Sequence, residues 1–153
     1  MDGPQESRRL RDTLRRLMVE HGTLDDAARP CGTPLSLPHA HALLELRAQE
    51  RPMSVSELAS RLRIDRTNVS RLCQRMEERG ELVRSVDSED GRVRTLRLTE
   101  LGEEAAARVD RARLVHFSRL AEILGDDLEA TVSAIDRLTS AIRRSRALEE
   151  PQP

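Results

Sequence analysis

Two short amphipathic segments joined by a three-residue connection constrain the fold of this chain more than any other feature. Ser54 and Glu57 form a capping box, so a helix should begin directly after Ser54 and end at the connection 63–65. Asp65 can cap a second helix, which should end near Gly80, a residue suited to the left-handed position after a helix. Two short helices that meet in this way are typical of a helix-turn-helix, which presents its second helix to the major groove of DNA.

A β-hairpin is predicted directly after this pair of helices. Residues 82–86 and 92–98 have an extended pattern, and the connection between them contains the turn-forming pair Asp90-Gly91. Thr99 can then cap a long helix that ends near Gly125. A helix-turn-helix followed by such a hairpin predicts a winged helix-turn-helix, in which the hairpin is the wing.

Longer amphipathic helices are predicted on both sides of this lobe. Residues 5–28 should form the first, and the Pro- and Gly-rich residues 29–38 should connect it to a second helix that carries Ala42, Leu43 and Leu46. Asp126 and Glu129 should open the last helix, whose apolar stripe is too long to bury against one small lobe. We therefore expect a mainly α, single-domain chain over 1–153. Its DNA-binding lobe should span 36–100, and its dimerisation helices 5–30 and 101–148.

Charge and aromatic content favour duplex DNA over other partners. The chain has 26 basic and 27 acidic residues, yet the segment 61–97 carries ten arginines against seven acidic residues. All of the basic residues are arginines, which we attribute to codon usage. Phe117 is the only aromatic residue among Phe, Trp and Tyr, so the stacking platforms typical of single-strand binding are missing.

The remaining composition bears on compartment and catalysis. Two cysteines form no disulfide framework, and the polar N-terminus resembles no signal peptide, so a cytoplasmic protein without a membrane span is expected. No Ser-His-Asp set, carboxylate pair or phosphate loop is evident. We therefore expect neither an enzyme nor a cofactor-dependent protein.

The segment 54–102, with "RMEERG" at the end of the second short helix and "LRLTELG" after the hairpin, closely resembles the MarR family. Residues 35–46, "LSLPHAHALLEL", are similar to the second helix of that family. The resemblance implies a homodimeric winged-helix regulator of transcription. It also implies a small-molecule effector that changes the grip on DNA, in a pocket between the dimerisation helices and the DNA-binding lobe, lined by the first, second and fifth helices.

The second short helix should supply the DNA-reading side chains. Val69, Leu72 and Met76 are predicted to face the core, which leaves an outward face near the N-terminal half of the helix. Arginine can bind guanine, and Asn or Gln can bind adenine, through paired hydrogen bonds, whereas Thr and Ser more readily hold phosphates. The predicted DNA-binding residues here are Arg66, Thr67, Asn68, Ser70, Arg71 and Gln74. The alternative for these residues is a merely solvated helix face. Separately, Arg75 and Arg79 could equally be paired with Glu78 or with nearby acids.

In the wing, Arg92 and Arg94 are the predicted contacts with the minor groove or its phosphates. The family commonly has a second basic residue where this chain has Gly91, which leaves these two arginines as the candidates. Arg92 could equally form a structural ion pair with an acid of the lobe.

Redox and metal sensing are the alternatives for regulation. Cys31 could be a redox switch, although thiol-sensing relatives carry their cysteine in the first helix, and Cys73 is predicted to be a packing residue. Several side chains could bind zinc, but only His41 matches a ligand position of the zinc-sensing subgroup, and His39 and His41 are predicted to be surface residues. We therefore expect no metal. The potential zinc ligands are His21, Cys31, His39, His41 and His116.

The sequence thus predicts a sequence-specific, duplex-DNA-binding regulator, and a repressor is expected rather than an activator. It should act as a homodimer on a pseudo-palindromic operator with half-sites roughly 34 Å apart. The alternatives are a winged-helix protein-interaction module and a non-specific architectural protein, which would show strong salt dependence without sequence preference.

Overall fold

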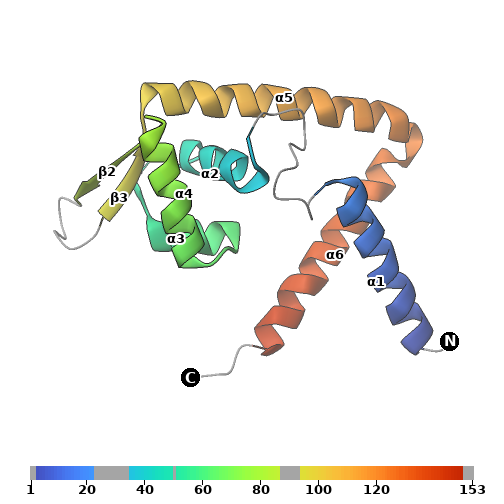
Figure 1. Ribbon diagram of the computed structural model, residues 1–153. Coiled ribbons are helices and arrows are strands. Elements are labelled where there is room, and N and C mark those ends of the chain that lie inside the picture. The colour runs from blue at the N-terminus through green and yellow to red at the C-terminus, as the bar shows by residue number, and fades with distance from the viewer. Residues whose placement is uncertain (1–2, 23–34, 50, 87–93, 150–153) are drawn as a thin grey trace. The chain divides into compact units, whose positions relative to one another are not determined.

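The computed structural model describes residues 3–22, 35–49, 51–86 and 94–149 of the chain. Along these residues, α1 (Gly3–Glu20) and α2 (Leu37–Arg47) are followed by β1 (Met53–Ser54), α3 (Val55–Leu62) and α4 (Arg66–Glu78). Strands β2 (Leu82–Val86) and β3 (Arg94–Leu98) precede α5 (Glu100–Leu124), the 3-10 turn η2 (Gly125–Asp127) and α6 (Leu128–Glu149). Figure 1 shows these elements by colour along the chain. None of the described helices is both long and apolar enough to cross a membrane.

The chain packs as two compact units that divide within α5. The first unit spans residues 1–114 and contains the predicted DNA-binding lobe. The second unit spans residues 115–153 and consists of the rest of α5, η2 and α6. Neither α1 in the first unit nor α6 in the second has a buried residue.

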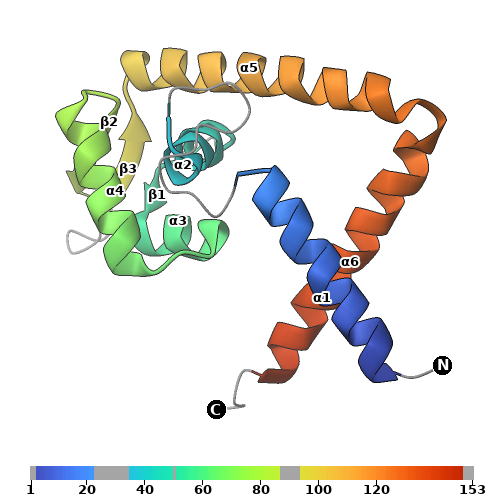
Figure 2. The same cartoon turned by 45° about the vertical axis from the view of Figure 1, so that its right-hand side comes forward.

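The predicted hairpin is part of a three-stranded antiparallel sheet with the strand order β1-β3-β2. Leu82 pairs with Leu98 and Val86 with Arg94, which gives the register of the hairpin. The third strand, β1, was not predicted: Met53 pairs with Leu96 on the other edge of β3 (Figure 2). A strand of two residues is too short to show alternation in a sequence, so only its partner reveals it.

One hydrophobic core holds α2, α3, α4, the sheet and the start of α5 together. Burying each large aliphatic side chain stabilises the lobe by roughly 1.5–3 kcal/mol. From α5 the core takes only the first turns, through Ala105, Ala106 and Val109. The largest side chains with almost no exposed surface are Leu43, Leu58, Met76, Leu96 and Val69.

Most predicted helix limits are confirmed, and one is wrong. The helices predicted after Ser54 and Asp65 begin where expected, and the long helix after Thr99 ends at Leu124, beside Gly125. The first helix, predicted to continue to residue 28, ends at Glu20 instead. It stops there because the chain turns at residues 21–22, where His21 and Gly22 still donate backbone hydrogen bonds to the last turn.

Two glycines shape the junction between α4, β2 and α5. Gly80 has a φ of 73°. Its backbone N–H donates a hydrogen bond to the Glu77 carbonyl oxygen, and the backbone N–H of Glu81 donates one to the Met76 carbonyl oxygen. This pair of bonds is the Schellman motif that ends many helices. Gly102 lies against the backbone of Glu81, so close that a Cβ atom at this position would be 2.0 Å from the Glu81 carbonyl oxygen. The chain can therefore pass from α4 into the wing and from the wing into α5 at one closely packed point.

Candidate nucleic-acid interface

Helix α4 has one buried face and one exposed face, as predicted. Val69, Leu72, Cys73 and Met76 are buried in the core. Ser70 is half-buried and the other predicted reading residues are exposed, namely Arg66, Thr67, Asn68, Arg71 and Gln74. The structure therefore gathers all six of the predicted side chains of this helix on or beside one solvent-facing surface.

Local hydrogen bonds fix where α4 begins. The Asp65 carboxylate accepts hydrogen bonds from the backbone N–H groups of Thr67 (2.8 Å) and Asn68 (3.2 Å). Such a cap satisfies donors that the first turn of a helix cannot satisfy, and a carboxylate also suits the positive end of the helix dipole. The first turn, which carries three of the predicted DNA contacts, is thus held in place by its own sequence.

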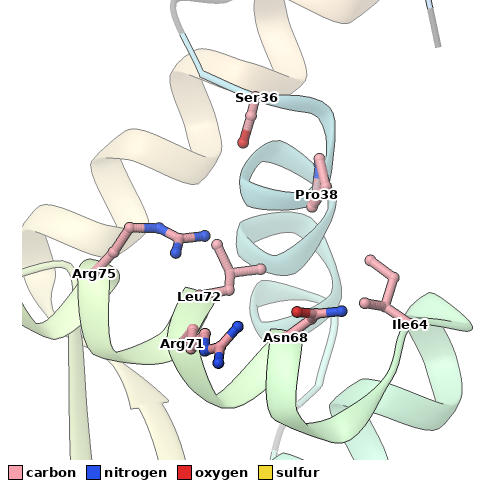
Figure 3. Close-up of a pocket in the computed structure, with 7 residues that line it drawn as sticks. All are labelled: Ser36, Pro38, Ile64, Asn68, Arg71, Leu72 and Arg75. Carbon is pink, nitrogen blue, oxygen red and sulfur yellow. The ribbon is translucent and has the colours of Figure 1, made fainter. Parts of the chain in front are cut away.

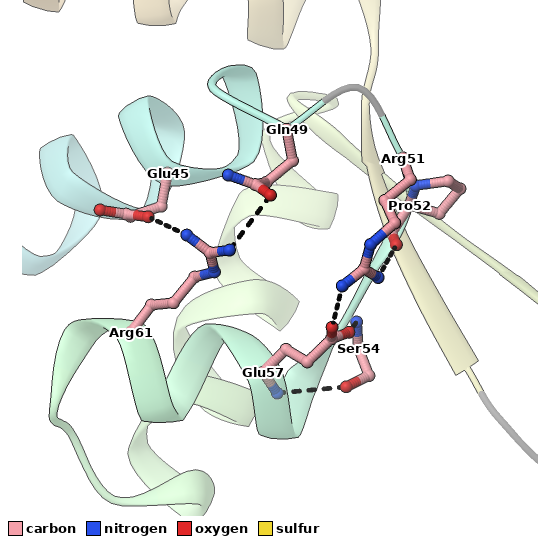
Figure 4. A network of polar contacts seen from close by, with 7 residues as sticks. All are labelled: Glu45, Gln49, Arg51, Pro52, Ser54, Glu57 and Arg61. Carbon is pink, nitrogen blue, oxygen red and sulfur yellow. Dashed lines mark hydrogen bonds and ion pairs between the residues drawn. The ribbon is translucent and has the colours of Figure 1, made fainter.

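The preceding helix is anchored by polar contacts on both sides (Figure 4). Ser54 and Glu57 form the predicted capping box of α3. Arg51 donates a 2.6 Å hydrogen bond to Glu57, and this bond, with those from Ser54, lowers the pKa of the Glu57 carboxyl to about 2. Arg61 reaches back to Glu45 of α2.

The three-residue turn between the helices has an unusual residue at its start. Arg63 has a φ of 56°, in the left-handed region that favours glycine. Its backbone N–H donates a hydrogen bond to the Ser60 carbonyl oxygen, and the backbone N–H of Ile64 donates one to the Ala59 carbonyl oxygen. Helix α3 therefore also ends in a Schellman motif. The angle at which α4 leaves α3 is set by this turn.

The wing contributes one described candidate. Arg94 is exposed at the first residue of β3, opposite Val86. Arg92 lies outside the described residues, as do Asp90 and Gly91, so its predicted contact remains a prediction. Arg84 of β2 points back to α4: its Nε lies 2.9 Å from Glu77 Oε2, and its Nη2 donates to the Ser70 carbonyl oxygen at 3.3 Å.

The arginines of α4 and the wing fall into two groups. Arg79 is paired with Glu81 at 3.1 Å and Arg84 with Glu77, so both guanidinium groups are engaged within the lobe. Glu78, the expected partner of an arginine, instead accepts a hydrogen bond from Gln74. The second group has no ion-pair partner among the described residues and faces solvent; it comprises Arg66, Arg71, Arg75, Arg94 and Arg97.

A cavity of about 490 Å³ lies between the start of α2 and α4 (Figure 3). Two guanidinium groups of α4, those of Arg71 and Arg75, line it together with the Asn68 amide and the Ser36 hydroxyl. Apolar surface comes from Pro38, Ile64 and Leu72. The cavity thus combines positive charge with an apolar wall, and it shares Asn68 and Arg71 with the predicted DNA-reading face.

The comparisons with known proteins point to one family. Residues 33–93 match the sequence profile described as the MarR family. The transcriptional repressor CouR, in a structure bound to a 23-mer DNA duplex, is 28% identical, with 91% of this chain and 98% of CouR covered and a TM-score of 0.75. Residues 33–93, which include α2 to β2 of the lobe, are thus a MarR-family segment. No curated protein matches the sequence with significance.

Other solved structures share the fold. A probable transcriptional regulator from Pseudomonas aeruginosa is 24% identical over 82% of this chain and 93% of its own, with a TM-score of 0.68. A MarR family protein from Bacillus stearothermophilus is 19% identical over 96% of this chain and 99% of its own, with a TM-score of 0.65. The predicted fold class is therefore confirmed, and the chain is a DNA-binding transcriptional regulator of the MarR type.

In this MarR-family lobe, a buried polar pair was missed by sequence reasoning. His39, predicted to be a surface residue, is 7% exposed, and its Nε2 lies 2.6 Å from Glu81 Oε2. The prediction was wrong because His39 lies on the face of α2 that is covered by the end of α4, where a buried carboxylate needs a partner. A polar residue among apolar neighbours at helical spacing was the only available signal.

The redox and metal alternatives receive no support from the described residues. Cys73 is buried as predicted, and burial raises the pKa of its thiol to about 11. His41 is half-buried, and burial together with Arg113 lowers the pKa of its imidazole. Groups of three or more potential metal ligands do not occur in the described parts of the chain. Cys31 lies outside the described residues.

Proposed function

We propose that this protein is a sequence-specific repressor that binds a pseudo-palindromic operator as a homodimer and releases it when an effector binds. The observation that carries the proposal is the exposed face of α4. Its Arg66 and Arg71 have no ion-pair partner in the described chain, and Asn68 and Gln74 lie beside them. These are the side chains that can read guanine and adenine in the major groove.

Repression is the proposed direction of control. CouR is a transcriptional repressor that was solved on DNA, and it shares 28% of its residues with this chain over nearly its whole length. A repressor needs no further contact beyond the DNA itself, because occupancy of the operator blocks transcription. The described residues of the lobe supply that contact surface.

A homodimer is proposed because both terminal helices expose apolar side chains. On α1, Leu10 and Leu17 are each 55% exposed, and on α6, Ile135 is 51% exposed. Neither helix has a buried residue, although each has an apolar stripe at helical spacing. Apolar surface of this extent usually marks an interface, and a second copy also supplies the symmetry that two half-sites require.

The cavity between α2 and α4 is the proposed effector site, although the family resemblance implied a different pocket, lined by the first, second and fifth helices. A carboxylate could pair with Arg71 and Arg75 while an apolar body packs on Ile64 and Leu72. Because Asn68 and Arg71 also belong to the DNA-reading face, such an anion would compete with DNA for the same side chains. The proposal therefore predicts that effector and operator exclude each other.

The test is binding to the DNA upstream of the protein's own gene and to a scrambled duplex of equal length, over a salt series. We expect tight binding to the first duplex and weak binding to the second, with a steep salt dependence in both. Arg71→Ala should weaken binding to the first duplex by about tenfold and to the scrambled duplex much less. Arg97→Ala, an exposed arginine near the base of the wing, is the charge-matched control.

The same assay separates the alternatives. Equal binding of wild-type protein to both duplexes, with a strong salt dependence, would favour a non-specific architectural protein. Absence of binding to either duplex would favour a protein-interaction module. A panel of aliphatic and aromatic carboxylates, titrated into the protein–DNA complex, tests the effector site, and Arg75→Ala should abolish any release that the panel produces.

A further inference from the structure

Arg84, in strand β2 of the wing, connects the wing to α4 through two different contacts. Its Nε lies 2.9 Å from a carboxylate oxygen of Glu77, and its Nη2 donates a hydrogen bond to the Ser70 carbonyl oxygen at 3.3 Å. Ser70 and Glu77 lie almost two helical turns apart on α4. The contact with Ser70 is a hydrogen bond, whereas the contact with Glu77 is an ion pair in which Nε makes no hydrogen bond, so one guanidinium group lies against both oxygens at once.

Both side chains of this ion pair are partly shielded from solvent. The Arg84 side chain is 27% exposed and the Glu77 side chain 32%, whereas Arg71, Arg66 and Arg94 are exposed. An ion pair that is partly removed from water is weakened less by salt than an ion pair on the surface. Arg84 is therefore occupied inside the lobe and does not present its charge to a partner as the exposed arginines do.

The contact joins the two parts that must reach DNA together. Ser70 directly precedes Arg71 on the reading face of α4. Arg84 lies in the middle of β2, opposite Leu96, and two residues further along the same ladder Val86 pairs with Arg94 at the start of β3. A rotation of the wing relative to α4 would break the Ser70 or the Glu77 contact, so these contacts fix the distance between the two DNA-facing surfaces.

We propose that Arg84 and Glu77 form a brace that holds α4 and the wing at the angle required for sequence-specific reading. Arg84 is then a positioning residue, which acts through Arg71 and its neighbours without touching DNA. This inference rests on the proposed DNA-reading function. It differs from a phosphate contact, the other role that an arginine next to a recognition helix could have.

The experiment compares wild-type protein with Arg84→Met, Arg84→Lys and Glu77→Ala. Methionine keeps the apolar stem of Arg84, so the packing between β2 and α4 is retained. The probes are a duplex selected from a random library by the wild-type protein and a scrambled duplex of the same length. Fluorescence anisotropy over a salt series gives both the affinity and its salt dependence, and thermal unfolding establishes that each variant is folded.

The brace predicts that Arg84→Met weakens binding to the selected duplex by about tenfold, leaves the scrambled duplex nearly unchanged and does not alter the salt slope. Arg84→Lys should lose much of the same preference, because one ammonium group cannot span both acceptors. A phosphate contact would instead lower the salt slope by about 0.9 in Arg84→Met, weaken both duplexes alike and be largely rescued by Arg84→Lys.

Glu77→Ala gives the sharpest test, because the two roles predict opposite signs. Removing a negative charge close to DNA should tighten binding to both duplexes if charge alone matters. The brace predicts weaker binding to the selected duplex, and a double variant with Arg84→Met that loses no more than Arg84→Met alone. A wild-type protein without sequence preference would overturn the proposed function and the brace with it. A preference that survives unchanged in Arg84→Met and Glu77→Ala would overturn the brace alone.

Discussion

Gly102→Ala should destabilise the protein, although the same change normally stabilises a helix. Gly102 lies in the first turn of α5, where alanine would ordinarily add about 0.5–1 kcal/mol of stability. Here the new Cβ would be 2.0 Å from the Glu81 carbonyl oxygen and 3.1 Å from Leu98 Cδ2. A carbon atom and a carbonyl oxygen normally stay about 3.3 Å apart or more, so the backbone must shift by about 1.3 Å.

The size of the effect follows from what that shift disturbs. The Glu81 carbonyl accepts a 3.1 Å hydrogen bond from the Thr99 backbone, which is worth about 0.5–1.5 kcal/mol. Overpacking typically costs about 1–3 kcal/mol more. After the helix preference of alanine is subtracted, the net loss in the free energy of unfolding is about 1–3.5 kcal/mol.

Urea and thermal unfolding at one fixed protein concentration measure this loss, because dimerisation would make the melting temperature depend on concentration. We expect a Tm lower by about 2–4 °C for each kcal/mol. Gly3→Ala is the matched control: no atom lies within 4 Å of the place that its Cβ would take in α1, so its stability should stay within about 0.5 kcal/mol of wild type. A Gly102→Ala variant as stable as wild type would refute the argument from close packing.

Three further predictions concern the same lobe. Arg63→Gly should raise the free energy of unfolding by about 0.5–1 kcal/mol in urea, because the left-handed backbone at this position strains any residue with a Cβ; a lower urea midpoint would contradict this. Asp65→Ala should cost about 0.5–2 kcal/mol and Asp65→Asn much less, since only alanine removes the cap of α4, and equal losses would show that the carboxylate charge matters more than the hydrogen bonds. In a Cys31→Ser background, Cys73 should resist a thiol reagent at pH 9 until the protein is unfolded, because burial holds its pKa at about 11 and the thiolate is the reactive form; rapid labelling of the folded protein would refute its burial.

Local patterns in the sequence were sufficient for the helix-turn-helix and the hairpin. The caps at Ser54 and Asp65 and the chain reversal at Gly80 depend on residues only a few positions away, so their physical causes are visible in the sequence. The same holds for the exposed face of α4: once Val69, Leu72 and Met76 face the core, helical geometry places Arg71 and Gln74 on the other side.

Contacts between residues far apart in the chain were decided only by the tertiary structure. His39 meets Glu81 across 42 positions, and β1 exists because Met53 finds Leu96. Such pairings have no periodic signal, since their energy comes from satisfying a buried charge or an open strand edge after the chain has folded. The brace from Arg84 to α4 has the same origin. The sequence thus determined which residues of α4 face solvent, and the packing of the lobe decided how firmly that face is held.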